Sequence, residues 1–323
     1  MADFLLAIQN PAGHHQPMKI VILGAGALGC YYGAKLAAAG EDVSFIMRSA
    51  CEPVRRNGLF IRSGDGDIVL KDVRAYASAR EAGKADLIAL TWKSTANTAL
   101  AGALPALIGE NTRLITLQNG MGNAETAARY MPPERIFIGL CFICAMMPEP
   151  GKIIHLEGGD MQFAPFVPST KGTQEAEEFA CLFRRAGLRT RAFGQPEQIQ
   201  WCKLAWNIPF NGLCLAHGGI SIEQLFSLPD QVERAECIMR EVCLAAEMRG
   251  FPPPREIVRK QMERTARMGA FIPSSAVDYL KKRPIEYDAI WGAPLEKAHE
   301  VNAPVPHWEQ LCRDIRARMA PEP

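Results

Sequence analysis

The sequence predicts an α/β domain with a mostly parallel sheet, followed by an all-α domain. Through the first half of the chain, short apolar runs rich in β-branched residues alternate with helical stretches, and such alternation gives parallel strands joined by right-handed crossovers. After Gly194-Gln195-Pro196 the strand patterns vanish, and the remainder is helical and punctuated by proline. We therefore expect a loose N-terminal extension at 1–17, the α/β domain at 18–194 and the helical domain at 195–323.

A glycine motif follows the first predicted strand, 19–23, and opens a helix predicted at 27–39. Gly24 permits a tight turn, Gly26 lets a pyrophosphate approach the backbone, and Gly29 lets the helix pack on the strand. The helix N-terminus adds free N–H groups and a positive dipole end. The pattern predicts a dinucleotide site in a Rossmann-type domain; the alternative is a purely structural turn. The predicted cofactor-binding residues here are Gly24, Ala25, Gly26, Ala27, Leu28 and Gly29.

The other elements of the α/β domain follow from the same patterns. Strands are predicted at 42–47, 86–91, 113–117 and 135–144, and helices at 94–107, 124–130 and 173–186. A short strand is expected at 189–193. Two hairpins interrupt the alternation: one joins 59–62 to 67–70 through a Gly-rich turn, and the other joins 152–156 to 160–165 across Gly158-Gly159.

Composition excludes several classes of protein. The 323 residues suffice for two cores, and the net charge of +1 gives no electrostatic reason to expect nucleic acid or an acidic membrane as partner. No apolar run is long enough to span a bilayer. The ten cysteines are scattered, which favours reduced thiols and a cytoplasmic location. Cys141-x-x-Cys144 lies in an apolar run, so we expect buried strand cysteines rather than a redox or zinc site, and no metal.

The end of the second strand indicates which dinucleotide binds. An NAD site usually places an acid there, but this strand runs into Arg48-Ser49. A guanidinium suits the 2′-phosphate of NADP, and Ser49, Arg55 or Arg56 could assist. The alternative is a solvated surface arginine. The sequence therefore favours NADP(H) over NAD.

The predicted helical domain opens with a polar stripe. Lys203, Asn207 and Asn211 recur every four residues on an otherwise apolar helix, within an arc of roughly 80°. Each unpaired buried polar group costs about 1–3 kcal/mol, so the stripe persists only if protein or a ligand satisfies it. A buried hydrogen-bond network is the alternative to a ligand site. Pro209 cannot donate to the carbonyl of Ala205, which predicts a kink or a frayed turn.

From Lys19 to its end the chain resembles the ketopantoate reductase family (2-dehydropantoate 2-reductases), which reduces a 2-keto acid to the 2-hydroxy acid with NADPH. Besides the glycine motif and the polar stripe, the resemblance is carried by Thr91-Trp92-Lys93, Leu117-Gln118-Asn119-Gly120-Met121-Gly122, Trp201, Ser274-Ser275 and Arg283-Pro284-Ile285-Glu286-Tyr287-Asp288.

The resemblance implies a role for each matched residue. Lys203 would be the general acid, or the cation that polarises the keto oxygen, and Glu286 would bind the hydroxyl and help to hold Lys203. Lys93 and Gln118 would lie near the nicotinamide. The substrate's carboxylate and hydroxyl groups would be oriented by Asn119, Asn207, Asn211 and Ser274, with Asn119 also touching the cofactor.

Each role has a plainer alternative. Lys93 could be a solvated loop lysine, and Glu286 could form a surface ion pair with the neighbouring basic residues. Ser274 could be only a helix N-cap, and Asn119-Gly120 only a turn.

Two departures from the family pattern leave the substrate less defined than the reaction: Ala276 stands where Met is common, and the segment 287–293 differs. We expect reduction of 2-dehydropantoate to pantoate, in pantothenate biosynthesis. The alternatives are another branched 2-keto acid or a non-catalytic NADP(H)-binding sensor. The partner is thus a small-molecule 2-keto acid, and a helical second domain is compatible with a homodimer.

Overall fold

The computed structural model describes residues 16–320 and divides into two compact units. Of the described residues, the first unit, which we call the α/β unit, contains 16–118 and Asn123–Pro196. The second, the helical unit, contains Asn119–Gly122 and 197–320. A boundary near residue 195 was expected, but the assignment of 119–122 to the helical unit was not. Most of the predicted extension, residues 1–15, lies outside the described residues.

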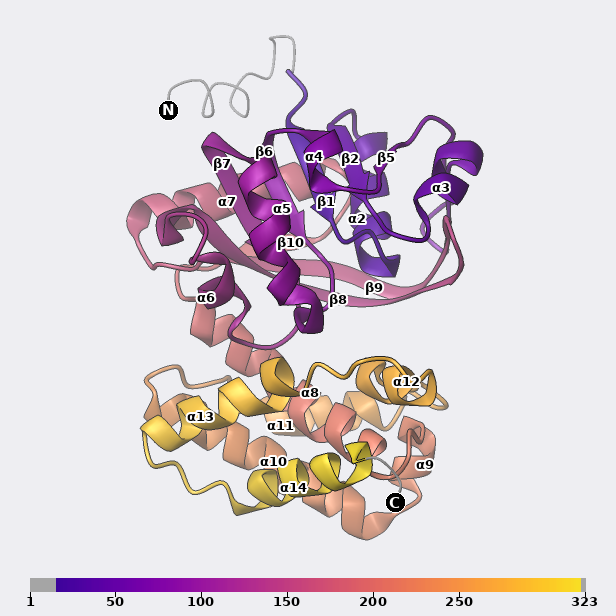
Figure 1. Cartoon of the computed structure of the whole chain (residues 1–323). Helices are drawn as coiled ribbons and strands as arrows, with labels where there is room; N and C mark the ends of the chain where they lie inside the picture. Colours follow the sequence, from indigo (N-terminus) through magenta and orange to yellow (C-terminus); the bar gives the residue numbers. More distant parts are fainter. Residues whose placement is uncertain (1–15, 321–323) are drawn as a thin grey trace. The chain divides into compact units, whose positions relative to one another are not determined.

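One sheet forms the centre of the α/β unit (Figure 1). Its strands run in the order β4-β3-β9-β8-β7-β6-β1-β2-β5, with β10 beside β9. Neighbouring strands are parallel except for β3–β4 and β8–β9, which confirms the predicted mostly parallel sheet. The strands are β1 (Lys19–Leu23), β2 (Asp42–Ile46), β3 (Leu59–Ser63), β4 (Ile68–Leu70), β5 (Arg74–Tyr76), β6 (Ala85–Leu90), β7 (Ile108–Thr116), β8 (Ile136–Glu149), β9 (Lys152–Pro165) and β10 (Thr190–Ala192).

Helices cover both faces of this sheet. Alternate residues of a strand point to opposite faces, and Ile20 and Ile22 of β1 share one core with Tyr32 and Phe183, whose rings meet edge to face at 6.3 Å. This core lies under α2 and α7, while α5 lies on the opposite side, in front of the sheet in Figure 1. The helices of this unit are α2 (Ala27–Ala38), α3 (Cys51–Asn57), α4 (Ala79–Ala82), η1 (Ser94–Ala99), α5 (Leu100–Leu107), α6 (Asn123–Ala127), η2 (Pro133–Arg135) and α7 (Thr170–Arg185).

The predicted hairpin across Gly158-Gly159 is wrong. Residues 152–165 form the single strand β9, antiparallel to β8, and its register shifts where Gly158 pairs with Ile143. Both glycines have positive φ, which suits a β-bulge as well as a turn. Likewise, the helix predicted at 94–107 begins as the 3₁₀ turn η1, and the short elements α3, α4 and β5 were not predicted.

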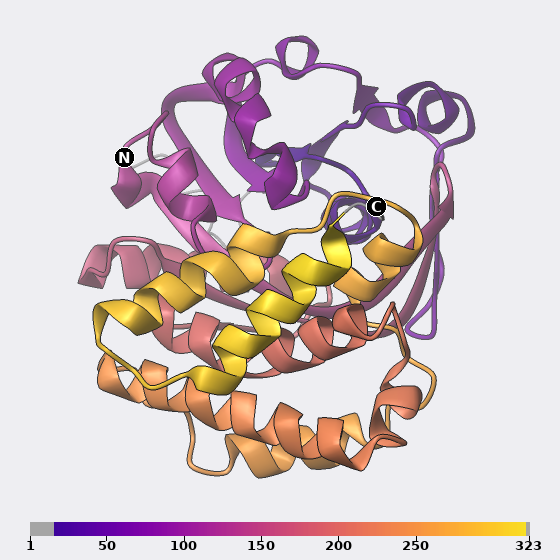
Figure 2. The ribbon, with the colours of Figure 1, turned by 60° about the horizontal axis from the view of Figure 1, so that its bottom comes forward.

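The helical unit has its own core, built around α8 (Pro196–Ala216). Three tryptophans, Trp201, Trp291 and Trp308, are fully buried in it. Helix α10 packs against α9, α11, α13 and α14 (Figure 2). The all-α second domain is confirmed, but α8 continues through Pro209 to Ala216, so no frayed turn forms. The other elements are α9 (Ile222–Phe226), α10 (Pro229–Met248), α11 (Ile257–Thr265), α12 (Ser274–Leu280), the π-helical stretch η3 (Asp288–Gly292), α13 (Ala293–Glu300) and α14 (Pro306–Met319).

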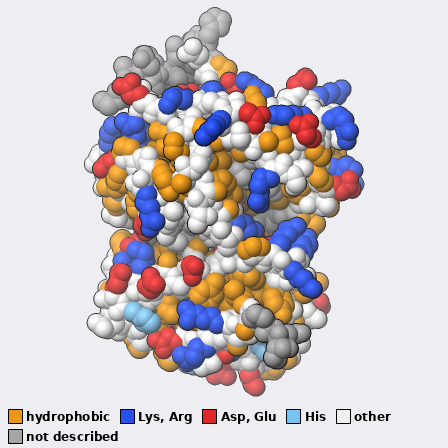
Figure 3. All heavy atoms as spheres, viewed as in Figure 1, with side chains coloured by type: hydrophobic (Ala, Val, Ile, Leu, Met, Phe, Trp, Pro, Cys, Tyr) orange, Lys and Arg blue, Asp and Glu red, His pale blue; other side chains and the backbone are white. Residues whose placement is uncertain are grey.

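The surface matches the near-neutral net charge of the chain. On the face shown in Figure 3, acidic and basic side chains are interspersed on each unit. Within residues 16–320, no helix combines the length and apolar character needed to cross a bilayer.

Candidate active site

The glycine motif forms a close turn between β1 and α2. Gly24 has φ +104°, and a Cβ there would lie 2.4 Å from Trp92. A Cβ on Gly29 would lie 2.5 Å from Oγ1 of Thr91, so the helix can approach the strand only because glycine stands there. Around Gly26, by contrast, a Cβ would meet nothing within 4 Å. Open space at Gly26 and the unpaired N–H groups that begin every helix make the start of α2 fit a pyrophosphate.

A polar network lies at the carboxyl ends of β6 and β7 in the α/β unit. Oδ1 of Asn97 accepts from the indole of Trp92 at 3.0 Å and from Nε2 of Gln118 at 2.8 Å. Gln118 also donates to the carbonyl of Trp92 and accepts from the hydroxyl of Thr116. The Gln118 amide is therefore engaged by protein at both ends. Lys93, the other predicted residue at this edge, is half-buried directly after Trp92.

The basic residues beyond β2 differ in their partners. Arg48 is exposed and forms no ion pair with any described residue. The guanidinium of Arg55, by contrast, is bound by the carbonyl of Ala75 at 2.6 Å, Glu52 at 2.8 Å and Glu81 at 3.0 Å. These hydrogen bonds leave Arg48 as the better candidate for a phosphate, with Arg55 serving the local structure.

In the helical unit, α8 carries the predicted polar stripe. The ammonium Nζ of Lys203 donates to Oδ1 of Asn119 at 2.8 Å. Asn119 precedes Gly120, whose φ of +83° is the left-handed conformation expected of a turn. The turn that was one interpretation of Asn119-Gly120 is thus present, and it also brings the Asn119 amide to Lys203.

The other two stripe residues lie deeper on α8. Asn207 is 7 % exposed and its side chain forms no hydrogen bond with another described residue. Asn211 is 2 % exposed, and its Oδ1 accepts from the hydroxyl of Ser274 at 3.3 Å and from the N–H of Ser275 at 3.1 Å. Ser274 is therefore not the N-cap of α12, which is Pro273. The stripe is satisfied by protein at Asn211, and the Asn207 amide is open to a ligand.

Glu286 is buried, with 8 % of its surface exposed, so it is not an ordinary surface carboxylate. It lies just before η3, and its carbonyl accepts from the N–H of Ile290. Single π-helical turns are rare and occur often at functional sites. In η3 the carbonyl of Ala289 accepts a 2.8 Å bond from the N–H of Met121. This contact and the 3.3 Å bond from Gln200 to the carbonyl of Gly120 carried no signal in the sequence.

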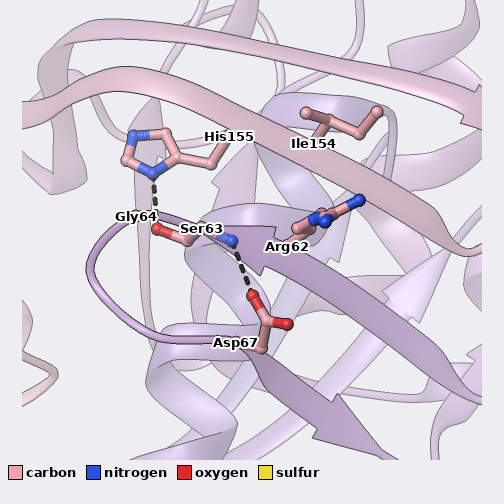
Figure 4. A pocket seen from close by; sticks show the side chains of 6 residues that line it. All are labelled: Arg62, Ser63, Gly64, Asp67, Ile154 and His155. Atoms are coloured by element: carbon pink, nitrogen blue, oxygen red, sulfur yellow. Dashed lines mark hydrogen bonds between the residues drawn. The ribbon is translucent and has the colours of Figure 1, made fainter.

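A separate pocket of about 310 Å³ lies in the α/β unit and contains none of the predicted site residues. Oγ of Ser63 lies 2.8 Å from Nδ1 of His155, and the N–H of Ser63 donates to Asp67 at 3.0 Å (Figure 4). The His155 ring also packs on Tyr31, with centroids 4.4 Å apart. These contacts join the end of β3 to β9. The pocket is lined by Arg62, Ser63, Gly64, Asp67, Ile154 and His155.

No disulfide joins any two of the ten cysteines, all of which lie in the described chain. Cys141 and Cys144 lie three residues apart in β8. Strand geometry separates such Cα atoms by about 10 Å, beyond the roughly 7 Å that a disulfide can bridge. In residues 16–320, no group of three or more His, Cys, Asp or Glu side chains could hold a metal ion.

Comparison with known proteins places both units in one family. The model for "Ketopantoate reductase PanE/ApbA" matches residues 20–168, and that for the C-terminal domain of the same family matches 196–319. The 2-dehydropantoate 2-reductase of Nostoc sp. is 35 % identical over 303 residues, which cover 92 % of this chain and 94 % of the relative.

Solved structures agree with this assignment. The crystal structure of 2-dehydropantoate 2-reductase from Geobacter metallireducens superposes with a TM-score of 0.89 at 36 % identity, covering 92 % of this chain and 99 % of that one. A D-mandelate dehydrogenase solved with NADH and anilino(oxo)acetate shares the fold, with a TM-score of 0.83 at 22 % identity and coverage of 93 % and 98 %. With both of its units matched, and with the glycine motif, the polar stripe and Glu286 in place, the chain belongs to the ketopantoate reductase PanE/ApbA family.

Proposed function

We propose that this chain is an NADPH-dependent reductase that converts 2-dehydropantoate to pantoate. The observation that carries the proposal is the hydrogen bond between Lys203 and Asn119 in the helical unit, on a chain that matches the family over both of its units. The family match favours ketopantoate over another branched 2-keto acid. A sensor without turnover would not require an ammonium bound to Asn119 or a buried carboxylate at Glu286.

The α/β unit is the proposed cofactor domain. The backbone from Gly24 to Gly29 receives the pyrophosphate at the N-terminus of α2, where open space lies around Gly26. Arg48 pairs with the 2′-phosphate, since it is exposed and forms no ion pair within residues 16–320. Lys93 lies on the nicotinamide side of the cofactor. The Gln118 amide is already bound to Trp92 and Asn97, so Gln118 contributes by holding this edge of the sheet in place rather than by binding the cofactor with a free amide.

The helical unit is the proposed substrate domain. An ammonium has three N–H donors, so Lys203 can bond Asn119 and still offer a proton to the keto oxygen. When NADPH is bound, it supplies the hydride that adds to C2 of the keto acid. Lys203 gives a proton to the oxygen as negative charge develops there, which yields the 2-hydroxy acid and NADP⁺, and it regains a proton from solvent.

The remaining polar residues orient the substrate. Asn207 offers an amide that no other described side chain or backbone group binds, while Asn211 holds Ser274 at the start of α12. Glu286 accepts from the substrate hydroxyl and keeps a negative charge near Lys203. We also propose a cytoplasmic location and a homodimer, which the composition and the helical second unit support.

The decisive experiment follows NADPH oxidation by purified protein with 2-dehydropantoate and, as matched control, 2-ketoisovalerate, which lacks only the hydroxymethyl group. We expect 2-dehydropantoate to give the higher kcat/KM and pantoate to be the product. A preference for 2-ketoisovalerate would favour the other branched 2-keto acids. No NADPH oxidation with either acid would overturn the proposed reductase.

A further inference from the structure

The segment 119–122, which we call the Asn119 loop, belongs to the helical unit although its flanking residues belong to the α/β unit. Two of its four residues, Gly120 and Gly122, have φ of +83° and +85°. Met121 is 2 % exposed and lies in the core of the helical unit. The loop is therefore held from outside, by contacts with the helices around it.

The first of these contacts comes from α8. Nε2 of Gln200 donates to the carbonyl of Gly120 at 3.3 Å, and Gln200 is 9 % exposed. Gln200 lies three residues before Lys203, and side chains three apart are neighbours on one helix face. The helix that carries the ammonium thus also binds the backbone next to its hydrogen-bond partner, Asn119.

The second contact comes from η3. The carbonyl of Ala289 accepts from the N–H of Met121 at 2.8 Å, and a Cβ on Gly120 would lie 2.0 Å from that carbonyl oxygen. Ala289 lies three residues after Glu286. The Asn119 loop is therefore bound on one side by the helix of Lys203 and on the other by the turn that follows Glu286.

We infer that Gln200 is a positioning residue for the reaction: with the backbone of Ala289, it holds the Asn119 loop so that Asn119 presents Oδ1 to Lys203. Gln200 acts through Asn119, and its removal loosens the acceptor that Asn119 presents to Lys203. This inference rests on the proposed function, and it extends that function to residues outside the polar stripe.

The test replaces Gln200 by methionine, which keeps the length of the side chain and removes its donor. Because a hydrogen bond contributes about 0.5–1.5 kcal/mol, we expect kcat to fall about threefold to tenfold while the Kd for NADPH is unchanged. Gln198→Met is the matched control, since Gln198 is an exposed glutamine on the same helix. It should leave kcat at the wild-type value.

A double-mutant cycle separates positioning from general loosening. If Gln200 acts through Asn119, then Gln200→Met causes no further loss of kcat in an Asn119→Ala background. If the two losses multiply, or if Gln200→Met lowers only Tm and leaves kcat intact, the inference is overturned.

Glycine variants test the second contact. Gly120→Ala and Gly122→Ala carry the same strain of positive φ, but only the first adds a Cβ that meets the Ala289 carbonyl, since the neighbour nearest to a Cβ on Gly122 is 3.8 Å away. We expect the larger loss of kcat for Gly120→Ala. Equal losses would contradict a role for the Ala289 contact.

A readout independent of turnover distinguishes this inference from the proposed function. The ¹³Cε NMR signal of Lys203, assigned with Lys203→Arg, should move in Gln200→Met and Asn119→Ala but not in Gln198→Met. If the wild type reduces no keto acid and the signal still moves, the function fails and the positioning stands. An unmoved signal in Gln200→Met overturns the positioning, whatever the activity.

Discussion

The ammonium of Lys203 donates a 2.8 Å hydrogen bond to Oδ1 of Asn119, a residue 84 positions earlier in the chain. Both residues belong to the helical unit, although Asn119 directly follows the α/β residue Gln118. The bond directs one N–H of the ammonium toward Asn119. An amide acceptor, unlike a carboxylate, adds no negative charge of its own, which suits the proposed role of Lys203 in polarising a keto oxygen.

Replacing Lys203 by alanine should therefore remove the acid. We expect kcat with 2-dehydropantoate to fall by the equivalent of about 3–5 kcal/mol of barrier, with little change in NADPH affinity. Steady-state kinetics and fluorescence titration of NADPH measure the two quantities. A Lys203→Ala enzyme with nearly normal kcat would exclude Lys203 as the acid.

Replacing Arg48 by alanine should alter cofactor preference. A charge-assisted bond to phosphate contributes about 1.5–3 kcal/mol, so we expect KM for NADPH to rise about tenfold to a hundredfold while KM for NADH stays nearly constant. Arg55→Ala is the control, because the hydrogen bonds of Arg55 go to Ala75, Glu52 and Glu81. It should lower Tm and leave the preference for NADPH unchanged. If Arg55→Ala alone alters the preference for NADPH, then Arg55 rather than Arg48 binds the 2′-phosphate.

The buried carboxylate of Glu241 should stabilise the helical unit. It accepts from the backbone N–H groups of His307 at 3.0 Å and Trp308 at 2.8 Å, in the first turn of α14. Glu241→Ala leaves both groups without an acceptor, so we expect a loss of about 2–4 kcal/mol in urea unfolding. Glu236→Ala, which removes an exposed ion pair with Arg240 on the same helix, should change stability by less than about 0.5 kcal/mol. Equal losses in the two variants would argue against this capping role.

The thiol of Cys144 should react slowly. Burial raises its pKa, and the carboxylate of Glu157 raises it further. Since the thiolate is the nucleophile, alkylation by iodoacetamide near neutral pH should be slower than that of free cysteine and should accelerate as pH rises. Mass spectrometry with Cys144→Ser as control locates the label. Rapid alkylation, or a Cys141–Cys144 disulfide after mild oxidation, would contradict the strand geometry.

The parallel sheet and the glycine turn could be predicted because their signals are local. The spacing of Gly24 and Gly29 between a strand and a helix is visible within a few residues, although the contacts that require glycine there, with Trp92 and Thr91, are made with a segment distant in sequence. The error at Gly158 has the opposite cause. A pair of glycines with positive φ suits both a turn and a bulge, and only pairing with β8, which tertiary structure decides, distinguishes the two.

The candidate site also contains residues that could be predicted from the sequence and residues that could not. Lys203, Asn207 and Asn211 share a helical period, so their common face could be read from spacing. Gln200 lies on that face too, but its contact and that of Ala289 could not be read from spacing, because both are with the backbone of a loop distant in sequence. A glutamine that bonds a remote carbonyl looks the same in a sequence as a solvated one.

The Asn119 loop also has a consequence for how such proteins can recombine. A crossover between two relatives at the junction of Pro196 and Glu197 would take Lys203, Gln200 and Glu286 from one parent and Asn119 from the other. The lysine that donates the hydrogen bond and the asparagine that accepts it would then come from different parent proteins. Taking residues 119–122 from the same parent as the C-terminal half would keep Asn119 and Lys203 from one ancestor, so the segments to be exchanged together are not contiguous in the gene.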